Sequence, residues 1–379
     1  MANFSELTTF LDNVSSRFGV PGCDCIVTID GRVAYRHSAG YKDEEAKVPV
    51  SCSDTYWIYS CTKLFTCTAA LQLMERGALT LDAPVCRVLP EFGALTTLKP
   101  DGTILPSKEI LTIRHLMTMT GGLDYDLTRP ALHRALRNGA VSTRDIVASL
   151  AEDPLQFEPG SHFLYSLCHD VLGAVIEQVS GISLAEYISR NIIEPLGMVD
   201  TTFHPTAAQL GRMATQYAHL DEKGTHRPIG QGNPFRFTEA YDSGGAGLLS
   251  TVDDYIRLIT ALALGGISPE GVRILSEESV NLMKTDALNP LQRHDFLIRS
   301  PAARGYSYGL GVRVMTEDIG TGVPVGEFGW DGAAGAYALV DNTNRLAMFY
   351  SQQVCNSRVT YQEIHPALRD TLYRCLGRV

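Results

Sequence analysis

The sequence has no long apolar run and no excess of basic residues. No stretch of about 18 consecutive apolar residues, the length that a membrane-spanning helix needs, occurs in it. The formal net charge is −10 and no basic stripe is present, so we expect neither nucleic acid nor an anionic membrane surface as a partner. The first residues lack a basic segment followed by an apolar one, which predicts a cytoplasmic protein without a secretion signal.

Motifs for metals and cofactors are also missing. The chain has no His-x-x-x-His, no Cys-x-x-Cys and no Gly-rich phosphate loop, so we expect neither a metal ion nor an organic cofactor. The 9 cysteines are odd in number and scattered through apparent core segments, which favours free thiols over a disulfide framework. With 45% hydrophobic and 20% charged residues, the composition fits a globular enzyme with a sizeable core.

The most informative stretch that is present is the tetrad Ser60-Cys61-Thr62-Lys63. β-branched and aromatic residues precede it, and an apolar segment that ends at Gly77 indicates a helix that begins at the tetrad. A three-residue offset places Ser60 and Lys63 on one helix face. A neutral lysine amine can take a serine proton, and burial against an apolar wall lowers the lysine pKa toward working pH. Alone, the tetrad also fits a helix N-cap followed by a surface lysine.

The two ends of the chain predict strands, and the middle predicts helices. Asp30-Gly31 between two alternating segments indicates a β-hairpin over 25–36, which follows a helical stripe over 4–19. Further strands are predicted over 308–314, 335–340 and 345–351, and helices over 62–77, 111–119, 143–152, 167–180, 183–194, 207–212, 252–264 and 361–375. We therefore expect an α/β (α+β) fold in which both termini build one antiparallel sheet flanked by helices. The sheet domain is predicted to comprise residues 1–79 and 248–379, with a helical domain over 80–247 inserted between them.

Four further motifs follow the tetrad in a fixed order. They are His115-Leu116-Met117-Thr118-Met119-Thr120-Gly121-Gly122-Leu123, Phe157-Glu158-Pro159-Gly160 ahead of Tyr165-Ser166-Leu167, Ile193-Glu194-Pro195-Leu196-Gly197-Met198, and Ser243-Gly244-Gly245-Ala246-Gly247. With these motifs the chain resembles the serine β-lactamase-like superfamily of class C β-lactamases and penicillin-binding proteins. Within that superfamily it is most similar to the family VIII carboxylesterases.

The resemblance implies a sheet domain and a helical domain with the active site in the cleft between them. It also implies that Ser60 is the nucleophile of an acyl-enzyme, that Lys63 is its proton partner, and that Tyr165 completes the base system. A phenol beside ammonium groups has a lowered pKa, so we expect Tyr165 to act as a phenolate near neutral pH. An ordinary half-buried tyrosine is the alternative.

Two departures from the family pattern bear on the substrate, and the first is at 330–333. Trp330-Asp331-Gly332 stands where β-lactamases carry Lys-Thr-Gly. This change removes the lysine that pairs with the carboxylate of a β-lactam, and Asp331 is expected to add like-charge repulsion. Trp330 offers an apolar face to a substrate, although a core tryptophan is the alternative. Gly332 would let the substrate approach the strand edge, and the Ala333 N–H would complete an oxyanion hole with that of Ser60.

The second departure is Leu167, which takes the place of the asparagine in the family's Tyr-x-Asn motif. An apolar wall is expected where an amide would bind a peptide substrate. Both departures predict a serine carboxylesterase that acts on small, neutral, apolar esters. The alternatives are an acyltransferase, a weak β-lactamase or D-amino-acid peptidase, and a non-enzymatic binding protein. Loops over 86–110, 124–142 and 214–240 are expected to wall the cleft, and the oligomeric state stays open.

Overall fold

The computed structural model describes residues 2–220, 226–300 and 302–378. Its main element is an eight-stranded antiparallel sheet in the order β10-β11-β12-β13-β14-β1-β2-β3. The strands are β1 (Gly22–Ile29), β2 (Arg32–Asp43), β3 (Val48–Pro49), β10 (Tyr306–Tyr308), β11 (Arg313–Met315), β12 (Phe328–Asp331), β13 (Tyr337–Asp341) and β14 (Leu346–Ser351). Because β1 pairs with β14, with Ile26 opposite Phe349, the predicted sheet built from both chain ends is confirmed.

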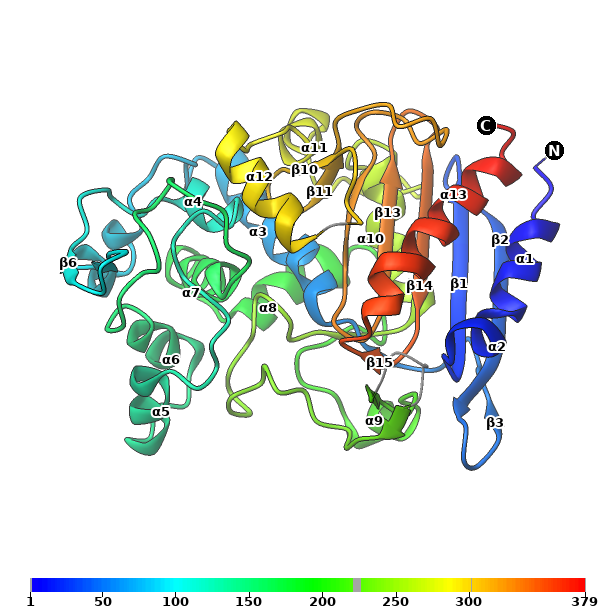
Figure 1. Cartoon of the computed structure of the whole chain (residues 1–379), viewed down its shortest axis with the longest axis horizontal. Coiled ribbons are helices and arrows are strands. Elements are labelled where there is room, and N and C mark those ends of the chain that lie inside the picture. The colour runs from blue at the N-terminus through cyan, green and yellow to red at the C-terminus, as the bar shows by residue number, and fades with distance from the viewer. Residues whose placement is uncertain (1, 221–225, 301, 379) are drawn as a thin grey trace.

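Helices cover both faces of this sheet. Helix α10 (Val252–Ala263) lies behind the sheet in Figure 1, and α1 (Ser5–Asp12) and α13 (His365–Cys375) lie in front of it. Helix α2 (Val14–Phe18) follows α1 after a break at Asn13, so the predicted stripe over 4–19 forms two helices. Both faces of the central strands are therefore buried, which explains why β13 and β14 are apolar without alternation.

Helix α3 (Thr62–Glu75) lies between the sheet and the helical part of the chain (Figure 1). Every residue from Thr62 to Leu73 is buried. Such a helix is apolar on all sides because it is covered on all sides, here by α7 and β12 among other elements. The strand-to-helix turn that carries Ser60 is thus fixed to the most buried helix of the fold.

The middle of the chain contains short helices and two small sheets. Its helices are η2 (Val85–Arg87), η3 (Pro90–Gly93), α4 (Ile113–Met117), α5 (Pro130–Arg137), α6 (Thr143–Ser149), α7 (Cys168–Ser180), α8 (Leu184–Ile188), η4 (Ser189–Ile193) and α9 (Ala207–Gly211). Strands β5 (Thr96–Leu98) and β6 (Ile104–Pro106) form a hairpin, and β7 (Tyr217–His219) pairs with β8 (His226–Pro228) and β15 (Val354–Cys355). The domain boundaries at 79/80 and 247/248 stay predictions.

Three parts of the sequence prediction fail. Residues 308–314 form the end of β10 and the start of β11, because the chain reverses at Gly311, where φ is +80°. A Cβ on Gly311 would lie 2.3 Å from Cys67 Sγ, so this tight turn packs directly on α3. Helices α5, α11 (Glu277–Met283) and α12 (Pro290–Arg299) were not predicted, and the predicted helix over 361–375 begins as a π-helical turn, η5 (Thr360–Ile364).

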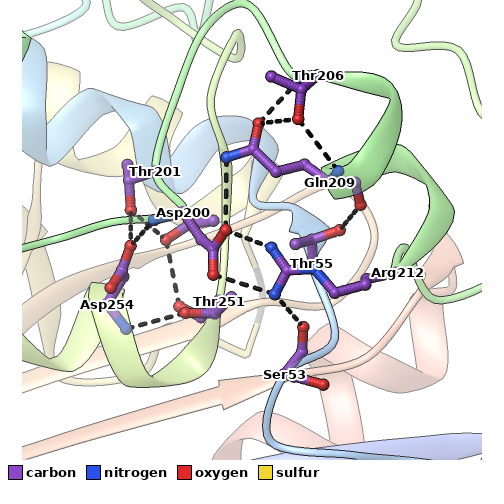
Figure 2. Close-up of polar contacts among 10 residues, drawn as sticks. Ser53, Thr55, Asp200, Thr201, Thr206, Gln209, Arg212, Thr251 and Asp254 are labelled. Carbon is purple, nitrogen blue, oxygen red and sulfur yellow. Dashed lines mark hydrogen bonds and ion pairs between the residues drawn. The ribbon is translucent and has the colours of Figure 1, made fainter.

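A polar network joins the segment after η4 to the strand that precedes Ser60 (Figure 2). Asp200 forms an ion pair with Arg212, whose guanidinium also donates to the Ser53 carbonyl at 2.9 Å. The Thr55 hydroxyl donates to the Gln209 carbonyl at 2.9 Å. The residues just before the tetrad are thereby held in place from outside the large sheet.

The same region is braced from α10. The Asp254 carboxylate accepts hydrogen bonds from the Asp200 N–H at 2.6 Å and the Thr201 hydroxyl at 3.0 Å. Strand β4 (Tyr56–Trp57) pairs with β9 (Leu249–Ser250), which leads into α10.

Within the described ranges no single helix is long and apolar enough to cross a membrane. One pair of helical segments bent by 78°, Cys168–Ser180 with Leu184–Ile193, meets the same length and composition criteria.

Candidate active site

Ser60 lies on a short 3-10 turn, η1 (Tyr59–Cys61), between β4 and α3. Tyr59 has a φ of +43°, a left-handed conformation that is strained for a bulky residue. Its ring is buried, and its hydroxyl donates to Gln216 Oε1 at 2.5 Å, which helps to hold the strained turn. The turn places Ser60 in the wall of a large cavity.

Lys63 is fully buried one turn further along, as predicted from the spacing, and its Nζ lies 3.2 Å from Ser60 Oγ. The amine has two other partners: the Tyr125 hydroxyl at 2.9 Å and the Gly245 carbonyl at 2.8 Å. Burial lowers the pKa of Lys63 to about 7, against the opposing charge of Asp170. A neutral amine can donate its two N–H groups to Gly245 and Tyr125, which leaves its lone pair for the Ser60 proton.

Tyr165 is next to this pair, but not as the expected phenolate. Lys63 Nζ lies 4.6 Å from the centroid of the Tyr165 ring, and Trp330 Nε1 donates to the phenol oxygen at 2.9 Å. Burial raises the pKa of Tyr165 above its usual value and outweighs the hydroxyl of Ser60 and the indole N–H of Trp330. The predicted lowering is therefore wrong, and the phenol keeps its proton at neutral pH.

Tyr125 is the site residue that sequence reasoning missed. Its hydroxyl contacts Lys63, and its ring centroid lies 5.3 Å from that of Tyr165. Burial raises the pKa of Tyr125 as well, so it too is a neutral phenol. The available signal was its position two residues after Leu123, the end of one of the family motifs.

Gly332 and Ala333 follow β12 and face the turn that carries Ser60. A Cβ on Gly332 would lie 2.5 Å from the Ile58 carbonyl oxygen, so glycine is required by the close approach of the two backbones. The Tyr361 hydroxyl holds the turn through the carbonyls of Gly332 and Ala333, at 3.0 and 2.9 Å. Within the described ranges, the N–H groups of Ser60 and Ala333 donate to no acceptor, as an oxyanion hole requires.

Two other predicted site residues, Asp331 and Leu167, have surroundings that differ from those expected. Asp331 lines the cavity, but its carboxylate pairs with Arg313 at 2.9 Å, which holds its pKa below the usual range despite burial. Its charge is therefore offset and does not simply repel an anionic substrate. Leu167 is only 2% exposed, precedes α7 and packs in the main core, so it does not form the predicted cavity wall.

The cavity has a volume of about 840 Å³ and an aromatic lining. Its aromatic residues are Tyr125, Phe163, Tyr165, Phe235, Phe296, Tyr306, Trp330, Tyr337 and Tyr361. The predicted loops over 124–142 and 214–240 contribute Tyr125 and Phe235, whereas 86–110 contributes nothing to the lining. Lining residues within 296–300, 302–303 and 356–369 form much of the remaining wall, a contribution that was not predicted.

The chain also contains a Gly-x-Ser-x-Gly pentapeptide that sequence reasoning overlooked, at Gly305-Tyr306-Ser307-Tyr308-Gly309. In α/β-hydrolases this motif forms a sharp strand-to-helix turn with an exposed serine. Here Ser307 lies within β10, is fully buried and donates to Asp286 Oδ1 at 2.5 Å. It has neither the turn nor the access of a nucleophile.

Comparisons with known proteins show to which family the chain belongs. The model of the β-lactamase family matches residues 8–369. The chain is similar to esterase EstB of Burkholderia gladioli, 32% identical over 97% of this chain and 95% of that protein. It is also similar to acyltransferase calJ of Penicillium decumbens, 31% identical over 87% of this chain and 83% of that protein. Among solved structures, "EstCE1, a hydrolase with promiscuous acyltransferase activity" has a TM-score of 0.80 at 28% identity and 97% coverage of both chains. The chain therefore belongs to the β-lactamase family and is an enzyme, a serine hydrolase with the β-lactamase fold.

Proposed function

We propose that this enzyme is a carboxylesterase that cleaves esters of small apolar acids through a covalent acyl-enzyme on Ser60. The observation that carries the proposal is the buried Lys63 amine 3.2 Å from Ser60 Oγ, with a pKa lowered to about 7. A serine hydroxyl needs such a neighbouring base to become a useful nucleophile. The 32% identity to esterase EstB supports the ester as the substrate class.

In the acylation step, Ser60 Oγ attacks the ester carbonyl carbon while its proton passes to Lys63 Nζ. The negative charge that develops on the carbonyl oxygen is held by the N–H groups of Ser60 and Ala333. The ester C–O bond then breaks, and the leaving oxygen takes a proton from the neutral Tyr165 hydroxyl, which the Lys63 ammonium restores. Water attacks the acyl-enzyme by the same steps in reverse.

The cavity lining favours an apolar acyl or alcohol group next to Ser60. Trp330 is half-buried, its ring centroid lies 5.3 Å from that of Tyr165, and its edge packs against Tyr308. Such aromatic faces bind apolar groups through contact area and stacking. No lysine lines the cavity in the described part of the chain, and Arg313, a cation beside the end of β12, is paired with Asp331, so the lysine that pairs with a β-lactam carboxylate has no direct equivalent there.

Acyl transfer is the second candidate, and two observations favour it. The relatives include acyltransferase calJ and the structural neighbour EstCE1, whose description names a promiscuous acyltransferase activity. The volume of about 840 Å³ also has room for an acceptor alcohol beside an acylated Ser60. An alcohol would replace water in the second half of the reaction, and the residues and proton transfers would stay the same.

The first test is the hydrolysis of a short-chain p-nitrophenyl ester by the wild type and by Ser60→Ala. We expect the variant to lose at least about 10³-fold in kcat/KM, and mass spectrometry of the quenched wild type to find the acyl group on Ser60. Ser307→Ala is the matched control, since it removes the serine of the other motif, and it should keep its activity.

Two parallel assays separate the alternatives. Faster cleavage of a chromogenic cephalosporin than of the ester would contradict the esterase proposal. A primary alcohol added at increasing concentration distinguishes transfer from hydrolysis, because only a transferase forms the new ester in preference to the free acid. Full activity in Ser60→Ala would overturn the assignment of the nucleophile.

A further inference from the structure

Asp170 is a buried carboxylate that the mechanism above does not use. It lies in the first turn of α7 and is 1% exposed. Its Oδ1 accepts hydrogen bonds from the Tyr241 hydroxyl at 2.9 Å and the Ser243 hydroxyl at 2.6 Å. Its Oδ2 is buried and forms no hydrogen bond of normal geometry among the described residues, although the nearby Gly245 N–H lowers the Asp170 pKa that burial raises. A carboxylate oxygen without a partner costs stability, so its position calls for an explanation.

The unpartnered oxygen faces Lys63 across Gly245. A Cβ on Gly245 would lie 2.6 Å from Asp170 Oδ2, 3.0 Å from the Tyr125 hydroxyl and 3.4 Å from Lys63 Nζ. No direct ion pair joins the carboxylate and the amine among the described residues; both border the small space beside Gly245 that a Cβ would fill, and the Gly245 carbonyl accepts from Lys63. Any larger residue at 245 would displace one of these three groups.

We infer that Asp170 is a positioning residue for the reaction. Its carboxylate, held at a fixed separation from Lys63 by Gly245, stabilises the positive charge that Lys63 gains when it takes the Ser60 proton. In a buried site a new ammonium without a counter-charge is costly, and a fixed carboxylate of opposite sign reduces that cost without reorganisation. A buried aspartate likewise stabilises the imidazolium of a Ser-His-Asp triad, although there it acts through a direct hydrogen bond. The inference rests on the proposed role of Lys63 as the proton acceptor.

The separation has a chemical advantage over contact. A direct ion pair would keep Lys63 protonated and unable to act as a base, whereas the absence of a counter-charge would make the amine too weakly basic. Among the groups that face Lys63, Asp170 is the carboxylate. The others are neutral or weakly acidic: Cys61 and Cys67 on its own helix, Cys168 and His169 on α7, and Tyr125 and Tyr165 from the loops.

The test is the pH dependence of kcat/KM for a neutral p-nitrophenyl ester in the wild type and in Asp170→Asn. Without the carboxylate, the ammonium form of Lys63 is less stable, so the acid limb should move down by about one pH unit. The plateau should fall about 10²-fold, since Lys63 is then a weaker base. Asp242→Asn is the matched control, because Asp242 is also buried but pairs with His204 and not with the site. It should leave the acid limb in place.

A second readout does not depend on activity. In protein with ¹³C-labelled lysine, the Cε chemical shift that disappears in Lys63→Met reports the protonation of Lys63 directly. This signal should titrate at lower pH in Asp170→Asn than in the wild type. If Asp170→Asn does not fold, Gly245→Ala takes its place, and the signal should shift in the same direction. An unchanged titration of this signal and an unchanged acid limb would overturn the inference, even if the variant is less stable. Full activity in Ser60→Ala would instead overturn the proposed function, so the two failures are distinguishable.

Discussion

The burial that lowers the pKa of Lys63 also makes this residue destabilising. An exposed lysine has a pKa of about 10.4, whereas that of Lys63 is lowered to about 7. Between these values the unfolded chain binds one more proton than the folded chain at this position, so the free energy of unfolding rises with pH across that window. The cost of holding Lys63 is therefore full below about pH 7 and is gone above about pH 10.

Lys63→Met tests this relation, because methionine fills a similar volume without an amine. We expect kcat/KM to fall at least about 10³-fold while the melting temperature rises. The rise should be larger at about pH 6.5 than at about pH 9.5, since the lysine is costly only at the lower pH. Thermal denaturation of the wild type and the variant measures this difference in melting temperature at each of the two pH values. A melting temperature that falls equally at both would show that the three hydrogen bonds of Lys63 outweigh its burial.

For individual residues, the sequence predicted those that one helix brings together. It missed the residues that tertiary packing brings next to Lys63. The proximity of Ser60 and Lys63 follows from helix spacing, and the family motifs further along the chain pointed to their function. Tyr125 and Asp170 approach Lys63 from other elements, and their contacts depend on the backbone at Gly245. Leu167 was misplaced because the residue two positions after Tyr165 already begins the turn into α7 and points into the core.

Among the elements, the end of β12 determines whether the site is complete. It brings Trp330, Gly332 and Ala333 against the turn that carries Ser60, and Gly332 makes the contact with Ile58 possible. Gly332→Ala would place a methyl group 2.5 Å from a backbone oxygen that cannot move alone.

We expect Gly332→Ala to lower kcat/KM by about 10²-fold and stability by about 1–3 kcal/mol, since the oxyanion donors separate. Steady-state kinetics and urea denaturation measure the two effects. Gly211→Ala is the control: it lies in α9 with nothing within 4 Å of the added methyl, and it should be neutral or slightly stabilising. Equal activity of Gly332→Ala and the wild type would contradict the assigned oxyanion hole.

Among the helices and strands, the bounds of long periodic segments were predicted well, and those of irregular segments were not. The buried helix over 62–75 and helix α10 have clear limits, with Gly77 after the first and Thr251 capping the second. The error over 308–314 has a local cause: the residues on both sides of the turn have strand character, and the reversal at Gly311 depends on packing against α3. Nothing in the local sequence signals that contact.

For the whole molecule, the charge of the cavity differs from that of the chain. The chain carries a formal charge of −10, yet Arg299, Arg313, Arg358 and Arg369 line the cavity with Asp331 as the one carboxylate among the lining residues. Arg313 and Arg369 are buried and paired, whereas Arg299 and Arg358 are exposed and have no ion-pair partner among the described residues. The local potential should therefore favour anions near the exposed part of the cavity lining.

This difference predicts a salt effect that depends on the substrate. For an ester whose acyl chain ends in a carboxylate, we expect kcat/KM to fall about fivefold when the salt concentration is raised from low to above physiological. The kcat/KM of a neutral ester of equal length should change little. Arg299→Gln with Arg358→Gln should remove that difference, and Arg137→Gln, an exposed arginine outside the cavity, should not. Parallel salt dependences for the two esters in the wild type would contradict the prediction.

The sheet that both chain ends build also has a consequence for synthesis. As the chain leaves the ribosome, the segment with Ser60 and Lys63 emerges early, whereas β12 and β14 emerge near the end. The N-terminal strands β1 and β2 lack the neighbour β14 until then, and Ser60 lacks the Ala333 N–H. A growing or truncated chain thus lacks the cavity wall opposite Ser60, and the complete cavity forms only when nearly the whole polypeptide is available to fold.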